Sequence, residues 1–141
     1  MAHYMEPLTR KIPFDEIVAI PLSQRRLLWR GYHHTAILAQ ALSRLTGKPM
    51  LTNCLKKIHG KRQVECQDRE ERLDNIKESF YISPHQEYRI VGKKFLIVDD
   101  VLTTGSTIYE CGKILRHHGA KDVHFVTFAR AGGPLLNEGI Y

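Results

Sequence analysis

Two adjacent carboxylates and a run of hydroxyl side chains lie close together near residue 100. Asp99 and Asp100 follow the apolar residues 95–98, and residues 103–107 come soon after them with one glycine and four hydroxyl side chains. Backbone N–H groups at the start of a helix, hydroxyl donors and a glycine that permits close approach together suit a phosphate group. Carboxylates repel phosphate, so they would bind another part of the same ligand, either sugar hydroxyls or a magnesium ion held through water. A ribose with a 5′-phosphate has both parts at a suitable separation.

Simpler explanations account for fewer of these residues. A helix N-cap needs a single hydroxyl, whereas four of the five residues 103–107 carry one. A P-loop is excluded because the chain contains no GxxxxGK[ST] pattern. A receiver domain also has paired acids at a strand end, but it needs a longer chain after them than the 41 residues that follow Asp100.

The elements around this segment predict a parallel α/β sheet. A continuous apolar run at 94–99 indicates a strand buried on both faces, and the spacing of apolar residues predicts helices over 35–46 and 108–118. Shorter β-branched or aromatic runs predict further strands at 16–20, 50–55, 80–81 and 123–129. Strands that alternate with helices form parallel sheets with right-handed crossovers, and ligands bind beyond the carboxyl ends of such strands. Asp99 and Asp100 are expected at one of these ends.

Length and composition favour one globular domain over residues 1–141. The chain has 43% hydrophobic and 26% charged residues, an ordinary globular balance. Residues 1–13 are expected to form a loose polar arm, residues 56–78 a mobile arm with little apolar surface, and residues 130–141 an irregular tail. We expect no membrane span and no signal peptide, and therefore a cytoplasmic protein.

The net charge indicates a class of partner, and the cysteine spacing bears on a structural zinc site. Lys and Arg number 21 against 15 Asp and Glu, which gives a formal net charge of +6. This balance suits an anionic partner, either nucleic acid or a polyphosphate metabolite. The three cysteines form no CxxC pair, so a structural zinc site is not expected.

The segment 95–107 resembles the loop that binds 5-phosphoribosyl-1-diphosphate (PRPP) in type I phosphoribosyltransferases. The resemblance implies a Rossmann-like α/β fold with a parallel sheet, flanked by helices, and a mobile arm. It also implies that the two acids bind the ribose hydroxyls as the catalytic pair, that the turn holds the 5′-phosphate, and that Mg²⁺ binds together with PRPP without a direct protein ligand. The implied PRPP-binding residues are Asp99, Asp100, Val101, Leu102, Thr103, Thr104, Gly105, Ser106 and Thr107.

A second segment is similar to the ComF competence-protein family within these enzymes. Residues 20–23 read Ile-Pro-Leu-Ser, and spaced arginines and Gly31-Tyr32 follow. His33 and His34 stand where that family typically has Asn-Gln. The resemblance implies that this loop receives the pyrophosphate through Arg25, Arg26 and Arg30, whose guanidinium groups match phosphate oxygens.

The basic segment before residue 80 resembles the flexible loop that closes over PRPP in type I enzymes. Its pattern of Gln, Arg-x-x-Asn and Phe is similar to that of the ComF family, and the residues that the resemblance assigns to this loop are Lys57, Gln63, Arg69 and Arg72. Such a loop shields the reacting centre from water.

The resemblance implies a phosphoribosyltransferase that takes part in DNA uptake during natural competence. Two alternatives remain open from the sequence. One is a nucleobase salvage enzyme, which would turn over PRPP with a particular base. The other is a non-catalytic adaptor that binds other competence proteins or single-stranded DNA, although the basic arm lacks the interleaved aromatic residues of a stacking platform.

Overall fold

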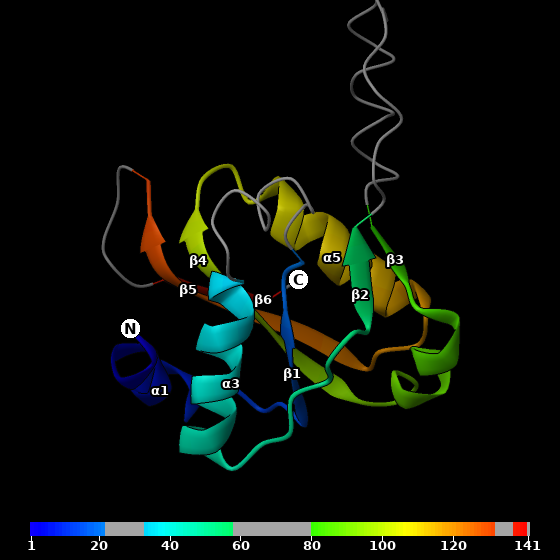
Figure 1. Cartoon of the computed structure of the whole chain (residues 1–141), viewed down its shortest axis with the longest axis horizontal. Helices are drawn as coiled ribbons and strands as arrows, with labels where there is room; N and C mark the ends of the chain where they lie inside the picture. Colours follow the sequence, from blue (N-terminus) through cyan, green and yellow to red (C-terminus); the bar gives the residue numbers. More distant parts are fainter. Residues whose placement is uncertain (22–32, 58–79, 132–136, 141) are drawn as a thin grey trace, which may run out of the picture.

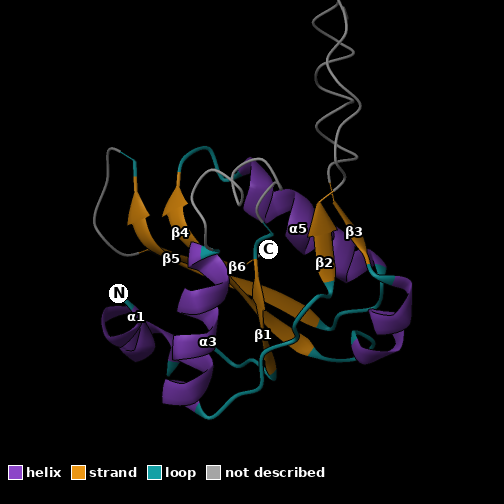
Figure 2. Ribbon diagram, in the orientation of Figure 1, coloured by secondary structure: helices purple, strands orange, loops and turns teal. Residues whose placement is uncertain are grey.

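A four-stranded sheet forms the centre of the molecule (Figures 1 and 2). The computed structural model describes residues 1–21, 33–57, 80–131 and 137–140. The strands are β1 (Glu16–Ala19), β4 (Lys94–Leu102), β5 (Asp122–Arg130) and β6 (Asn137–Ile140), in the spatial order β1-β4-β5-β6. The first three are parallel, and β6 pairs antiparallel with β5.

Helices cover both faces of this sheet. Helix α1 (Ala2–Thr9) and helix α3 (His34–Thr46) pack on one face, against Leu96, Val98 and Val126. Helix α5 (Ser106–His117) packs on the other face, against Phe95 and Ile97. Because successive residues of a strand point to opposite faces, the unbroken apolar run of β4 is needed to fill both cores.

A small two-stranded sheet lies beside α5 (Figure 1). Its antiparallel strands are β2 (Leu55–Lys57) and β3 (Phe80–Ile82), and the 3-10 helix η1 (Pro84–Arg89) follows β3. Phe80 and Ile82 are buried in the same core as α5, whereas Tyr81 between them is exposed. The pairing of the two strands places Lys57 beside Phe80.

The parallel α/β fold predicted from the sequence is confirmed, with the strand–helix–strand unit β4-α5-β5 at its centre. The helix predicted over 35–46 is α3, and Gly47 ends it with the expected left-handed conformation (φ 69°). No helix among the described residues is long and apolar enough to cross a membrane.

Three predicted segments were wrong, and each differs because of a distant partner. Residues 1–13 contain helix α1 rather than a loose arm, since Met5 is fully buried (0% exposed) against the α3 side of the core. The tail 130–141 contains β6, which pairs with β5. The strand predicted at 50–55 is reduced to one bridge between Met50 and Ile17, and the regular strand begins only at Leu55.

Candidate functional site

The two carboxylates lie where β4 loses one of its neighbours. Strand β1 ends at Ala19, which pairs with Val98, whereas β5 accompanies β4 as far as Leu102. Strand β4 therefore continues three residues beyond the end predicted from the sequence. Asp99 and Asp100 occupy this extension, where the described residues give β4 no pairing partner on the β1 side.

The alternation of β4 directs the two carboxylates to opposite faces of the sheet. Ile97 packs in the core with Cys111 of α5, and Val98 packs in the core with α3. Asp99 follows on the α5 face and Asp100 on the α3 face. Each carboxylate accepts a hydrogen bond from the backbone N–H of the next residue, at 2.9 Å for Asp99 and 2.8 Å for Asp100. This leaves each carboxylate with further acceptor capacity at the same edge.

Burial makes Asp99 an unusual carboxyl group. Desolvation raises its pKa from 3.8 to about 7, the backbone N–H of Asp100 lowers it in part, and the negative charge of Asp100 raises it again. Burial raises the pKa of the Cys111 thiol to about 12, and the negative charge of Asp99 also raises it. The positive charge of Lys57 lowers the pKa of the same thiol. Asp99 and Lys57, which are distant in sequence, therefore both lie near Cys111.

The turn after β4 carries hydroxyl groups at the start of α5. Gly105 is the N-cap with φ 80° and supplies no side-chain cap. The hydroxyls of Thr104 and Ser106 lie 2.9 Å apart, and the N–H of Ser106 donates to Thr104 Oγ1 at 3.3 Å. Thr103, Thr104 and Ser106 are exposed, while Thr107 is half-buried. The arrangement has the donors and the dipole that an anion requires.

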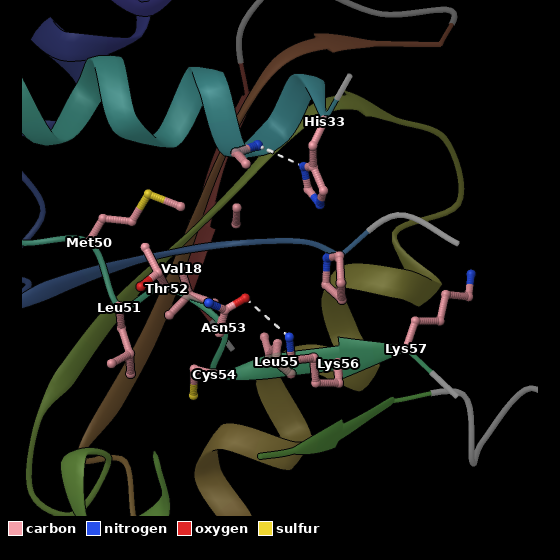
Figure 3. Close-up of a pocket in the computed structure, with 13 residues that line it drawn as sticks. Val18, His33, Met50, Leu51, Thr52, Asn53, Cys54, Leu55, Lys56 and Lys57 are labelled. Atoms are coloured by element: carbon pink, nitrogen blue, oxygen red, sulfur yellow. Dashed lines mark hydrogen bonds between the residues drawn. The ribbon is translucent and has the colours of Figure 1, made fainter. Parts of the chain in front are cut away.

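A cavity of about 470 Å³ opens beside this edge (Figure 3). It lies between the end of β1, the start of α3 and residues 50–57, and β1 is the direct neighbour of β4. Among the described residues that line it, the basic side chains are His33, Lys56 and Lys57, and none is acidic. The described lining residues are Val18, Ala19, Pro21, His33, Ala36, Met50, Leu51, Thr52, Asn53, Cys54, Leu55, Lys56 and Lys57.

The lysines of the cavity have contacts that hold them at its rim. Lys56 Nζ donates to Asn53 Oδ1 at 3.1 Å, and Lys57 Nζ lies 5.3 Å from the centre of the Phe80 ring, a cation–π contact. Among the sequence-predicted loop residues, Lys57 is thus placed at the cavity. Sequence reasoning missed Lys56, Asn53 and His33. The adjacent lysines and the histidine after the arginine loop were visible, but only the fold brings them together.

The remaining predicted site residues divide into two groups. Residues Asp99 to Thr107 lie together in the β4-α5 unit, as expected. The residues predicted to bind pyrophosphate or to belong to the flexible loop lie outside the described part of the chain, namely Arg25, Arg26, Arg30, Gln63, Arg69 and Arg72.

The described residues form no protein-only metal centre. Among residues 1–21, 33–57, 80–131 and 137–140, no group of three or more His, Cys, Asp or Glu side chains could hold an ion. Asp99 and Asp100 are the acidic pair at the site, and their carboxylates lie on opposite faces of the sheet. A divalent ion here would have to take most of its ligands from a bound phosphate compound and from water.

Comparison with known proteins places the chain in a sequence and structural context. The phosphoribosyl transferase domain family matches residues 31–138. Competence protein F of Haemophilus influenzae is 36% identical over 86% of this chain and 52% of its own length, and the DNA utilization protein YhgH of Escherichia coli K12 is 33% identical over 77% and 46%. The chain thus spans about half the length of these curated relatives.

A solved structure supports the fold independently. The purine phosphoribosyltransferase from Pyrococcus horikoshii superimposes with a TM-score of 0.58 over 92% of this chain and 70% of that chain, at 20% identity. At this level of identity the likeness concerns the fold, and it agrees with the parallel sheet and flanking helices described above.

Proposed function

This chain belongs to the phosphoribosyl transferase domain family, and from this membership we propose that it binds PRPP at the end of β4. The observation that carries the proposal is the β4-α5 unit. It combines a carboxylate pair beyond the last β1–β4 pair with a helix N-terminus whose N-cap is Gly105 and with exposed hydroxyls. These groups suit the two chemically different ends of a ribose 5-phosphate.

Each part of PRPP has a complementary surface. The 5′-phosphate would accept hydrogen bonds from the turn 103–107, and the ribose hydroxyls would donate to Asp99 and Asp100. The diphosphate would extend toward the end of β1, where Lys57 lines the cavity and the arginines of residues 25–30 follow in sequence. A compound that carries several negative charges also suits the net charge of +6.

Magnesium would enter this site as part of the ligand complex. The described side chains do not form a cage for an ion, but a diphosphate supplies the oxygen ligands that Mg²⁺ prefers, and water completes its coordination. When bound, the ion would neutralise charge on the diphosphate. The carboxylates of Asp99 and Asp100 would orient the ribose beside it.

The chemistry that follows is transfer of the phosphoribosyl group. The bond between ribose C1 and the diphosphate oxygen breaks, the diphosphate leaves with the electron pair, and a nitrogen nucleophile forms the new bond to C1. The chain would contribute positioning and electrostatic stabilisation of the separating charges. In this arrangement Asp99 and Asp100 would lie beside the ribose, and their negative charge would favour the positive charge that develops on it.

Calorimetric titration tests the proposal directly. PRPP with Mg²⁺ and ribose 5-phosphate should each bind, and Asp100→Asn should weaken both by about tenfold or more. Asp122→Asn is the matched control, because Asp122 lies at the opposite end of the sheet in an ion pair with Arg116 (2.8 Å). Wild-type protein that binds neither ligand, or equal losses in both variants, would contradict the proposal.

The names of the relatives favour a cellular role in DNA uptake or use. Competence protein F and the DNA utilization protein YhgH match most of this chain, so we place the chain in the same kind of process. Two alternatives for the biochemical activity, a salvage enzyme and a non-catalytic adaptor, can be distinguished by assay. A salvage enzyme would release diphosphate from PRPP with a particular nucleobase, whereas an adaptor would bind single-stranded DNA or competence proteins without turnover. Binding to DNA should weaken steeply with salt if it is electrostatic.

A further inference from the structure

His33 caps the start of α3 and borders the cavity. Its Nδ1 accepts a hydrogen bond from the backbone N–H of Ala36 at 3.0 Å. Figure 3 shows the ring extending from the helix start into the space above β2, with this bond dashed. A nitrogen that accepts from an N–H carries no proton of its own, so the neutral ring must carry its proton on Nε2.

Thr35 offers Nδ1 a competing bond. The Thr35 hydroxyl donates to the carbonyl of Ile20, at the end of β1, at 2.7 Å, and its oxygen lies 3.0 Å from His33 Nδ1. The single hydroxyl proton is directed to Ile20, so this second contact becomes a hydrogen bond only when Nδ1 is protonated and donates. Protonation would exchange the bond from Ala36 for a bond to Thr35, without a large movement of the ring.

The surroundings disfavour the charged form of the ring when no anion is present. Burial lowers the pKa of His33, a bond to its own backbone raises it in part, and the charge of the adjacent His34 lowers it further. In the described part of the chain, the other charged side chains that line the same cavity are Lys56 and Lys57, which are also basic. An anion in the cavity would reverse this balance by favouring the charged ring.

We propose that His33 is a positioning residue for the diphosphate of PRPP, which on binding draws a proton onto the ring and shifts Nδ1 from Ala36 to Thr35. The proposal rests on the proposed function for the identity of the ligand. The neutral ring and the doubly protonated ring both carry a proton on Nε2. The ring therefore keeps its N–H donor toward the cavity when it becomes positively charged. The new bond would join the ring to the Thr35 hydroxyl, which already ties the start of α3 to the end of β1.

The matched variant is His33→Asn. An asparagine side chain can still accept from the N–H of Ala36, so the helix cap is preserved, but it cannot titrate. Inorganic diphosphate and ribose 5-phosphate are titrated calorimetrically into both proteins at pH 6 and pH 8. Because diphosphate also titrates, the informative quantity is the ratio of wild-type to variant affinity at each pH. We expect a ratio of about five for diphosphate at pH 6, falling toward one at pH 8, and a ratio near one for ribose 5-phosphate at both.

A second measurement uses wild-type protein alone. The ring ¹⁵N signals of His33 should report the Nε2-protonated neutral ring at pH 7.5 and should move toward the doubly protonated ring as inorganic diphosphate is added. His33→Ala, which removes both cap and ring, should lower the melting temperature, whereas His33→Asn should restore most of it.

The outcomes separate the two proposals. If PRPP and ribose 5-phosphate bind but wild-type and His33→Asn proteins show equal diphosphate affinities at both pH values, the role of His33 is refuted and the PRPP site stands. If wild-type protein binds neither PRPP nor ribose 5-phosphate, the proposed function fails. The ¹⁵N titration with inorganic diphosphate then decides the role of His33 by itself, since unmoved ring signals would refute it.

Discussion

Replacing Asp99 by asparagine should stabilise the protein at alkaline pH while it weakens PRPP binding. The folded chain raises the pKa of Asp99 from 3.8 to about 7, chiefly by burial. The folded state therefore binds a proton more tightly than the unfolded state, and the stability that this provides is lost as pH rises from about 4 to 7. Asparagine is neutral at every pH, and its Oδ1 can still accept from the backbone N–H of Asp100.

The size of the effect follows from the pKa difference. A shift of about three units corresponds to a ceiling of about 4 kcal/mol, at about 1.4 kcal/mol per unit. Asp99 is only half-buried, and solvent screening reduces this ceiling, so a gain of about 1–2 kcal/mol at pH 8.5 is expected. At pH 4 the difference between variant and wild type should nearly vanish, because the wild-type carboxyl is then protonated in the folded state and partly in the unfolded state.

Urea unfolding followed by circular dichroism at pH 4, 6 and 8.5 measures this difference. Asp122→Asn, in a partly exposed ion pair with Arg116, serves as the control and should change stability by less than about 1 kcal/mol. In parallel, Asp99→Asn should lower PRPP affinity by at least tenfold, about 1.4 kcal/mol. The reasoning fails if Asp99→Asn is less stable than wild type at pH 8.5, or if its effect is the same at all three pH values.

Three further changes test other parts of the structure. Met5→Ala should lower the free energy of unfolding by about 2–4 kcal/mol, because Met5 is fully buried; chemical denaturation that shows no loss would mean that α1 does not pack on the core. Lys93→Met should cost about 1–3 kcal/mol, since Glu16 is 4% exposed and would keep only the longer contact to Arg89 at 3.7 Å. Adding Glu16→Gln to Lys93→Met should restore the melting temperature, because it removes the buried carboxylate that has lost its lysine partner. Gly105→Ala should cost about 1 kcal/mol because its φ is 80°, and it should weaken ribose 5-phosphate binding in calorimetry, whereas unchanged affinity would place the phosphate elsewhere.

The placement of Asp99, Asp100 and residues 103–107 in one strand–turn–helix unit could be predicted because they are contiguous in the chain. The apolar run 95–98, the two acids and the turn 103–107 together make one strand–turn–helix unit, and short-range patterns determine such a unit. The same holds for α3, whose apolar spacing and terminal Gly47 are local signals. Even there, the length of β4 depended on β5, which extends the strand to Leu102.

The cavity could not be predicted because its walls come from three separate segments. His33, Asn53 and Lys56 meet only after α3 and β2 have packed around the end of β1. The proposed role of His33 depends on a hydrogen bond from Ala36 and on the distance to Thr35 Oγ1, which a residue pattern does not contain. The pKa of Asp99 likewise follows from burial, which is a property of the packed sheet.

The sequence by itself determined the α/β class, the order of the main helices and strands, and the contiguous acids and hydroxyl residues at the end of β4. Periodicity and turn chemistry act over a few residues, so the chain carries these features wherever it folds. Only the tertiary structure decided that residues 2–9 form a packed helix, that β6 pairs antiparallel with β5, and that Glu16 is buried against Lys93, 77 residues away. Contacts between distant segments stabilise those features, and these contacts form only when the hydrophobic core has packed.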